Sequence, residues 1–329
     1  MQHEILHAMN VAQEYQPPRF LTNGHAQTVY PILFRKCREL PVLRQRLELP
    51  DGDFLDIDWL TGGHGRLAFL CHGLEGNSRG LHTSNLMSHL FASGWDVAAM
   101  NSRGCSGEPN RLPRLYHSGE TDDLHFALGA ALAEGGYAVA TLVGYSMGGN
   151  QILKYLGEGP ERVPPQVRAA ATLSVPCDLE DSAEALARPA NRVYMRYFLR
   201  SLRSKIAAKK MLFPDLFDTE GLAGISTFEA FDERYTAPLH GFASARDYWR
   251  KASSLPHLPR ICVPTLLVNA RNDPFLGPAC FPANEAAGNP NLRLEVQCNG
   301  GHLGFVTLDG TGVYWSERRV VSFLKSYMQ

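Results

Sequence analysis

The sequence lacks a long apolar run and an excess of charge of one sign. No apolar stretch approaches the ~20 residues that a membrane-spanning helix needs. The 329 residues carry 32 Lys and Arg against 33 Asp and Glu, which gives a formal net charge of −1. A general nucleic-acid binder would show a basic excess. We therefore expect no transmembrane segment and no nucleic-acid partner, which leaves room for peripheral contact with a membrane surface.

Cysteine pairs are also missing, because the seven cysteines are scattered, odd in number and contain no Cys-x-x-Cys pair. This usage favours a reducing compartment and argues against a zinc site or a disulfide framework. Cys71 and Cys262 fall inside expected core strands, where cysteine behaves as a small hydrophobic residue. Residues 1–7 lack a basic region followed by an apolar one, so we expect no signal peptide. Together these features predict a cytoplasmic protein.

The sequence does contain a regular alternation of strand and helix patterns over its first half. A hairpin is expected at residues 43–60, because a Gly-containing turn separates two alternating runs. Strands are then expected at residues 66–71, 95–100, 137–143 and 167–175, and helices at residues 81–92, 121–135 and 147–157. Such alternation predicts a mainly parallel sheet with helices on both faces.

The pattern changes after Val175, where helical segments follow one another without strands as far as Ile261. A structureless loop of that length would be implausible in a compact protein. Strands at residues 261–270 and 292–296 and a closing helix at residues 313–328 then resume the first pattern. We therefore divide the chain into a core part at 1–175, an inserted helical cap at 176–260 and a second core part at 261–329.

The most informative motif is Gly-Tyr-Ser-Met-Gly at residues 144–148, which lies between an expected strand and an expected helix. In that context a G-x-S-x-G motif indicates a nucleophile elbow, a sharp turn that exposes the serine hydroxyl. Glycine at the outer positions avoids a collision between the strand and the helix and permits unusual backbone angles. Ser146 is therefore the candidate nucleophile.

A serine of this kind needs a base and an orienting acid, in the chain order Ser, Asp or Glu, His. Asp273 follows the expected strand at residues 261–270, and His302 lies in a glycine-flanked loop after the next strand. The backbone N–H groups of Leu74 and Met147 are the expected oxyanion donors. The alternatives are that Asp273 only starts a turn and that His302 is a loop residue without a role. We interpret His72 as a structural hydrogen-bonding residue and not as a second base.

The expected cap contains a basic stripe. Arg188, Arg192, Arg196 and Arg200 each follow the last by four residues, which places them on one face of a helix. The stripe is either a solvated helix face or a surface that attracts anionic substrates or lipid head groups. The apolar residues between these arginines are expected to form core or to line an acyl pocket; they are Val193, Tyr194, Tyr197, Phe198, Leu202 and Ile206.

Several further motifs resemble the YheT-like branch of the alpha/beta hydrolases, over residues ~17 to ~325. They are residues 20–28 (Phe-Leu-Thr-Asn-Gly-His-Ala-Gln-Thr), 71–76, 103–110, 116–123, 174–179, 231–232, 240–242, 272–275 and 301–304. One departure is Asn101-Ser102 before Arg103, where an aromatic residue is commoner. The resemblance implies the alpha/beta-hydrolase fold with an inserted helical cap, and carboxylic-ester hydrolysis by Ser146, Asp273 and His302. Members resemble acyl-ester, acylglycerol and phospholipid hydrolases, so it names no single substrate.

We therefore predict a serine esterase that needs no metal and no organic cofactor. A thioesterase or an acyltransferase on the same three residues is the nearest alternative. A non-catalytic protein that binds a hydrophobic ligand is the alternative from another class. The family also shows a histidine and an aspartate that are sometimes interpreted as an acyltransferase motif, here His117 and Asp122. We interpret both residues, and Arg103, as structural.

Overall fold

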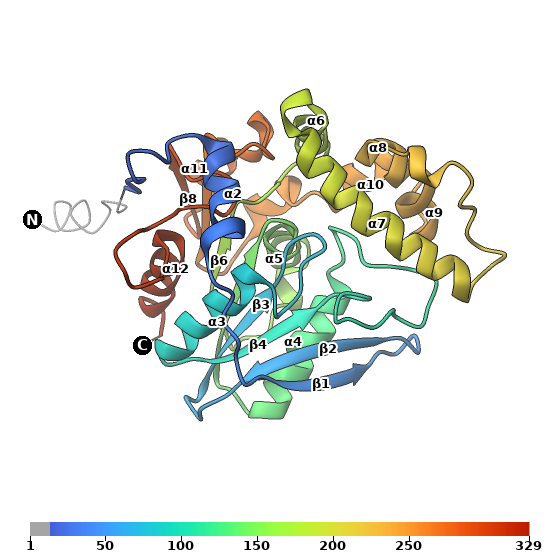
Figure 1. Cartoon of the computed structure of the whole chain (residues 1–329). Coiled ribbons are helices and arrows are strands. Elements are labelled where there is room, and N and C mark those ends of the chain that lie inside the picture. The colour runs from blue at the N-terminus through green and yellow to red at the C-terminus, as the bar shows by residue number, and fades with distance from the viewer. Residues whose placement is uncertain (1–13, 329) are drawn as a thin grey trace, which may run out of the picture.

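The computed structural model describes residues 14–328, so the expectation of no signal peptide concerns residues outside the described part. An eight-stranded sheet forms the centre of the molecule (Figure 1). Its strands are β1 (Leu43–Glu48), β2 (Phe54–Leu60), β3 (Arg66–Cys71), β4 (Asp96–Asn101), β5 (Val139–Tyr145), β6 (Val167–Leu173), β7 (Thr265–Ala270) and β8 (Leu292–Gln297). The order is β1-β2-β4-β3-β5-β6-β7-β8, with the β1–β2 and β2–β4 pairs antiparallel and the others parallel. The predicted mainly parallel sheet is confirmed.

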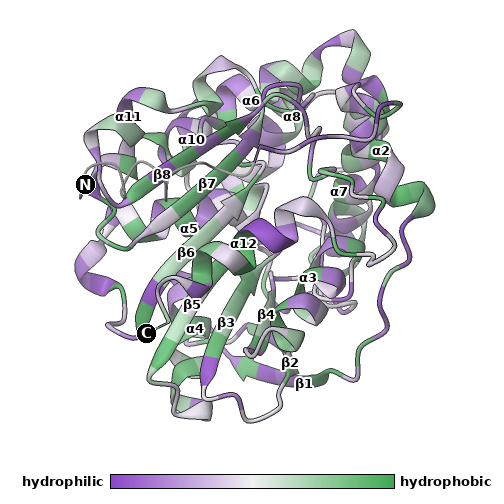
Figure 2. Cartoon of the chain, turned by 90° about the vertical axis from the view of Figure 1, so that its left-hand side faces the viewer, coloured by the Kyte–Doolittle hydropathy of each residue, from purple (hydrophilic) through white to green (hydrophobic). Residues whose placement is uncertain are grey.

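Helices cover both faces of the sheet and bury a separate apolar cluster on each side. The core helices are α2 (Gly24–Phe34), α3 (Leu81–Ala92), α4 (Asp122–Gly135), α5 (Met147–Glu158), α11 (Ala283–Gly288) and α12 (Trp315–Lys325). Helices α4 and α5 supply side chains to one cluster, and α3 and α12 supply them to the other. In Figure 2 the central strands are predominantly hydrophobic, and α12 lies across the face nearer to the viewer.

The segment between β6 and β7 is helical, as the sequence predicted for a cap. It contains α6 (Leu179–Ala187), α7 (Arg192–Leu212), α8 (Phe228–Phe231), a π-helical turn (Asp232–Thr236), α9 (Ala237–Leu239) and α10 (Ala245–Ala252). These helices gather beside the sheet in Figure 1, where α7 runs diagonally below α8 and α10. Their apolar residues form a third cluster, which includes Leu199, Ile206, Phe231 and Trp249. The residue limits of the three-part division stay a prediction.

The expected placement of Cys262 in a core strand is wrong. Cys262 is exposed, because β7 begins only at Thr265 and the residues before it lie outside the sheet. Thr121 precedes α4, and its hydroxyl bonds the carboxylate of Glu158. Gly136 ends that helix with a φ of 59°. Within residues 14–328, no helix is long and apolar enough to cross a membrane.

The basic stripe is shorter than the spacing predicted. Arg188 has extended backbone angles after α6, so it does not share a helix with the other three arginines. Arg192, Arg196 and Arg200 are exposed on α7. Val193 and Tyr197, which were expected to be core or to line the pocket, are 73% and 67% exposed, because each immediately follows an outward-facing arginine on the helix surface. Phe198, Leu202 and Ile206 do face inward.

Candidate active site

Ser146 lies at the turn between β5 and α5, with a φ of 54° and a ψ of −126°. This left-handed backbone is strained for a residue with a side chain, and such strain is common at functional sites. The flanking glycines make the turn sterically feasible. A Cβ atom on Gly148 would lie 2.3 Å from the carbonyl oxygen of Cys71, and one on Gly144 would lie 2.6 Å from the carbonyl oxygen of Gly148. The collision expected from the sequence is therefore present.

Asp273 and His302 form a buried pair beside this serine. Nδ1 of His302 lies 2.9 Å from Oδ2 of Asp273 and 3.2 Å from Oδ1. A proton on Nδ1 satisfies the carboxylate and leaves Nε2 with a free lone pair. The ring of Phe275 stacks on the imidazole with centroids 4.1 Å apart, and the backbone N–H of Phe275 donates to Asp273. Ser146 and His302 line the same pocket.

The loop that carries His302 is held by α2, a helix that the sequence analysis did not predict. The hydroxyl of Thr28 accepts a hydrogen bond from the His302 N–H at 2.8 Å and donates to the carbonyl of Gly24 at 2.7 Å. Gly24 itself packs so tightly that a Cβ atom would lie 1.8 Å from the carbonyl oxygen of Asn272. The capping residue Asn23 was the available signal for a helix here, because its side chain accepts from Ala26 N–H.

Leu74 and Met147, whose backbone N–H groups are the expected oxyanion donors, lie near Ser146. Leu74 follows β3, Met147 opens α5, and both line the pocket with Ser146. The loop after β3 passes close to the serine, since a Cβ atom on Gly73 would lie 3.2 Å from the Cβ of Ser146. Each residue thus brings a backbone N–H group to the neighbourhood of the serine hydroxyl.

Glu75 anchors this oxyanion loop to the helical segment. Its φ of 56° is in the left-handed region, and its side chain is almost fully buried. The carboxylate pairs with Nζ of Lys205 on α7 at 2.9 Å and accepts from the Tyr116 hydroxyl at 2.5 Å. Sequence reasoning assigned no role to Glu75 or Lys205, because the contact joins segments that are far apart in the chain.

His72 has both ring nitrogens engaged. Nδ1 lies 2.7 Å from the carbonyl oxygen of Gly73, and Nε2 accepts from the backbone N–H of Ser102 at 3.1 Å. Burial lowers the pKa of His72 to about 4, so the ring is neutral near pH 7. This geometry agrees with the structural interpretation of His72.

Arg103 and the residues before it also have structural contacts. The guanidinium forms two hydrogen bonds of 2.7 Å with Asp123 and one of 2.9 Å with Asp53. Asn101, the departure from the family pattern, accepts from Ser78 N–H and donates to the carbonyl of Asp56. These contacts fasten the loop after β4, and Arg103 does not line the pocket of Ser146.

His117 and Asp122 are not partners. Nδ1 of His117 accepts from Gly119 N–H, and its ring packs against His240 with centroids 4.6 Å apart. Asp122 is exposed and pairs with Arg162 at 2.7 Å. Burial lowers the pKa of His117 well below its usual value. An acyltransferase that uses His117 as its base therefore gains no support from this geometry.

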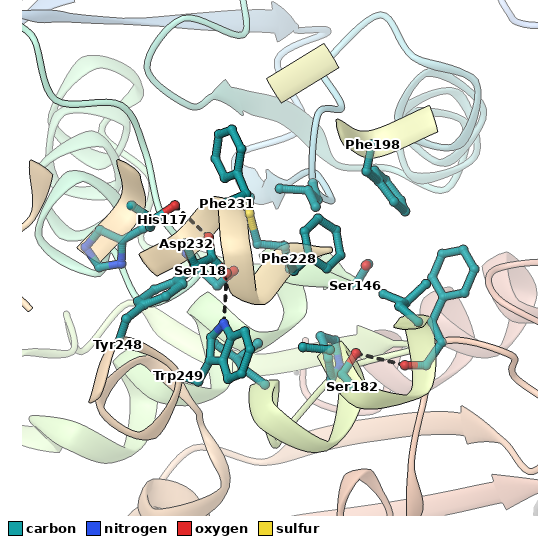
Figure 3. Close-up of a pocket in the computed structure, with 18 of the residues that line it drawn as sticks. His117, Ser118, Ser146, Ser182, Phe198, Phe228, Phe231, Asp232, Tyr248 and Trp249 are labelled. Carbon is teal, nitrogen blue, oxygen red and sulfur yellow. Dashed lines mark hydrogen bonds between the residues drawn. The ribbon is translucent and has the colours of Figure 1, made fainter. Parts of the chain in front are cut away.

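The pocket at Ser146 has a volume of about 110 Å³ and lies between the core and the helical segment. Figure 3 shows Ser146 on one side of it and His117, Ser118 and Asp232 on the other. Its apolar lining comes largely from the segment between β6 and β7, namely Leu179, Ala183, Leu186, Phe198, Leu202, Phe228 and Phe231. Within residues 14–328, no group of three or more His, Cys, Asp or Glu residues could hold a metal ion.

The chain is similar to several known proteins. A family model described as the alpha/beta hydrolase fold matches residues 69–307. The chain is 37% identical to YheT of Escherichia coli, covering 96% of this chain and 94% of YheT. It is 29% identical to human phospholipase ABHD3, covering 91% and 75% of the two chains. The structure of the Pyrococcus furiosus esterase Pf2001 matches with a TM-score of 0.60 at 17% identity, over 97% of this chain and 99% of that one.

The family model covers well over half of the chain, and the match to YheT extends along nearly all of it. The Pyrococcus structure shares the fold of this chain. The chain therefore belongs to the alpha/beta-hydrolase family, in its YheT-like branch, and is a hydrolase of the esterase and lipase type.

Proposed function

We propose that this protein is a serine esterase that cleaves carboxylic esters through an acyl-enzyme on Ser146. The observation that carries the proposal is the arrangement of three groups. Asp273 holds Nδ1 of His302 at 2.9 Å, and His302 shares a pocket with a serine on a strained turn. A base that is oriented by a buried acid and shares a pocket with a half-buried serine is the arrangement that acyl transfer requires.

The reaction proceeds in two halves. Nε2 of His302 takes the proton of Ser146 as Oγ attacks the ester carbonyl, and the Leu74 and Met147 N–H groups stabilise the negative oxygen. The imidazolium then gives its proton to the leaving alcohol, and the C–O bond breaks to leave the acyl-enzyme. Water repeats the sequence: it loses a proton to His302, attacks the acyl carbonyl and releases the acid, and Ser146 regains its proton. Asp273 fixes the tautomer and stabilises the charged imidazole.

The apolar lining favours an ester with an apolar acyl or alcohol chain. Phe198, Phe228 and Leu202 present hydrocarbon surface to whatever occupies the pocket. ABHD3 is named a phospholipase and Pf2001 an esterase, which supports an ester of a lipid-like or simple acyl group. A thioester would form the same acyl-enzyme and is the matched comparison substrate. Peripheral membrane contact and a cytoplasmic location stay predictions.

Substitution of the three groups tests the proposal. Ser146→Ala, His302→Ala and Asp273→Asn should each reduce kcat for p-nitrophenyl butyrate by roughly 10⁴-fold or more, and the double variants should lose little more than the single ones. A fluorophosphonate probe should label the wild-type protein and fail to label Ser146→Ala. Exposed Ser204→Ala on α7 is the control and should keep both properties. Labelling that survives Ser146→Ala would refute the nucleophile, and near-normal turnover in Asp273→Asn would refute the orienting acid.

A further inference from the structure

The side of the pocket away from Ser146 is polar. Asp232, Thr236, His117, Ser118 and Tyr248 all line it there, and Figure 3 shows Asp232, His117, Ser118 and Tyr248 gathered on this side. His117 and Ser118 belong to the motif at residues 116–123, and Asp232 belongs to the motif at residues 231–232. The proposed catalysis uses neither motif. His240 and Phe242 of a third such motif pack against the ring of His117. Three motifs without a catalytic role therefore meet at one end of the pocket.

Asp232 is the only carboxylate among the residues that line this pocket in the described part of the chain. It lies on the π-helical turn after α8, and π-helical turns are frequent at functional sites. Oδ2 accepts from Trp249 Nε1 at 2.8 Å, and Oδ1 accepts from the Thr236 hydroxyl at 2.6 Å. Two neutral donors leave part of the acceptor capacity of a carboxylate unused.

No positive charge within residues 14–328 pairs with this group. Among the described residues, the only side chains that hydrogen-bond Asp232 are the two neutral donors, and no Lys or Arg pairs with it. The nearby imidazoles do not supply a charge, since burial lowers the pKa of His240 to about 4 and that of His117 well below its usual value. A buried carboxylate without a cation is costly unless another group satisfies it.

The residues around the Asp232 carboxylate suit a hydrogen-bond donor that a substrate supplies. Phe231, Tyr248 and Trp249 line the pocket beside the carboxylate, and aromatic faces attract cations. An ammonium group would thus meet both a negative charge and aromatic rings, and a hydroxyl group would meet a free acceptor. A terminal methyl group would instead leave the carboxylate desolvated and unpaired.

We propose that Asp232 binds a hydrogen-bond-donating end of the substrate, an ammonium or hydroxyl group on the chain that occupies the pocket. The enzyme then prefers esters whose chain ends in such a group over esters of equal length that end in a methyl group. This inference rests on the proposed ester hydrolysis at Ser146. It adds a polar specificity determinant to a pocket whose other lining is apolar.

The test compares p-nitrophenyl esters that differ only at the chain end. Acyl chains of about five to eight carbons ending in an ammonium, a hydroxyl or a methyl group are hydrolysed at pH 7.5, and Ser146→Ala measures the uncatalysed background. At the best length, kcat/KM for the ammonium ester should exceed that of the methyl ester by roughly 10-fold or more. If kcat/KM for the hydroxyl ester exceeds that of the methyl ester by as much, hydrogen bonding is the source of the preference. If only the ammonium ester exceeds the methyl ester, charge is the source.

Asp232→Asn keeps the shape of the side chain and removes its charge, so the ratio of ammonium to methyl ester should fall by roughly 10-fold. Glu229→Gln is the matched control: it changes an exposed carboxylate on α8 and should leave the ratio unchanged. A wild-type preference for the methyl ester at every length would overturn the inference, whether or not Asp232→Asn folds. A wild-type protein that the fluorophosphonate probe does not label would refute the proposed ester hydrolysis. A different preference for the chain end would refute only the role of Asp232.

Discussion

At the scale of single residues, the buried carboxylate of Asp232 links substrate binding to stability. Burial raises its pKa from 3.8 to about 6. The protonated form is therefore the one that the folded state favours. The other titratable groups at this end are Tyr248, whose pKa is raised by burial, and His117 and His240, whose pKa values are lowered. Tyr248 and His240 therefore do not change their charge between pH 5 and pH 8.

Protonation of Asp232 favours the folded state. Because the pKa of Asp232 is raised in the folded state, the protonated group contributes to the free energy of unfolding. This contribution is complete below pH 3.8 and is lost as the pH rises through about 6. At pH 7.5 the ionised group costs on the order of 3 kcal/mol relative to the protonated one. Asp232→Asn should therefore raise the free energy of unfolding at pH 7.5 and have little effect near pH 4.

Urea denaturation of the wild type and of Asp232→Asn across pH 4 to 8 measures this difference, and Glu229→Gln again provides the control. A constant difference between wild type and Asp232→Asn at every pH would show that the group does not titrate in this range. A variant that is less stable at pH 7.5 would show that the two hydrogen bonds of the carboxylate outweigh its burial.

At the scale of elements, the contact between α2 and the loop of His302 holds the proposed base in place. Thr28→Val removes the oxygen that accepts from His302 N–H and leaves a buried donor without a partner, which costs ~1–3 kcal/mol. Because the loop carries the proposed base, we expect kcat to fall by roughly 10-fold while KM changes little. Thr28→Ser keeps the hydroxyl and should restore most of kcat.

Steady-state kinetics of the two Thr28 variants, with thermal unfolding alongside, separates positioning from a general loss of structure. If Thr28→Val loses thermal stability but keeps its kcat, the helix supports the fold and does not position the base. If Thr28→Ser is as slow as Thr28→Val, the hydroxyl is not the group that matters.

The elements differ in how well the sequence predicted them. The strands and helices from β1 to β6 were predicted within about two residues, because each has a local apolar period and turn residues at its ends. Helix α2 was missed, since Pro31 lies inside it and its buried side is small and polar. Cys262 was placed in the strand because residues 261–270 form one mainly apolar run, whereas β7 begins at Thr265.

In the candidate site, too, the residues with a local sequence signal were predicted and those without one were missed. Ser146, Asp273 and His302 were predicted because each belongs to a short motif at the end of a strand. The supports of these residues are Thr28, Lys205 and Glu75, whose contacts cross long stretches of sequence. Asp232 could be identified only once its burial and its lack of a cation were visible. Local periodicity contains no information about such contacts, so they required the structure.

At the scale of the whole molecule, charge is nearly balanced but unevenly distributed. Helix α7 contains no Asp or Glu, and Arg192, Arg196 and Arg200 are exposed on it. Exposed charges act over a Debye length of ~8 Å at physiological ionic strength. If this face attracts anionic esters, kcat/KM for mono-p-nitrophenyl glutarate should fall several-fold between ~20 mM and ~500 mM salt. Neutral p-nitrophenyl butyrate should show little change.

The double variant Arg192→Gln/Arg196→Gln should lose this salt dependence and keep its kcat for the neutral ester, because neither residue lines the pocket of Ser146. Arg168→Gln/Arg260→Gln is the matched control, since both arginines are exposed near the starts of β6 and β7, at the opposite end of the sheet. Equal salt responses for the anionic and neutral esters would identify the face as solvated surface.

The position of α2 has a consequence for the time at which the site becomes complete. Residues 24–28 leave the ribosome long before the loop that they hold, because that loop contains His302. Synthesis proceeds from the N-terminus at ~5–20 residues per second. A nascent chain that already contains Ser146 and its turn therefore has no base for another 156 residues, the interval from 146 to 302. On the proposed mechanism, the enzyme is inactive until His302 has been made and its loop has met residues 24–28.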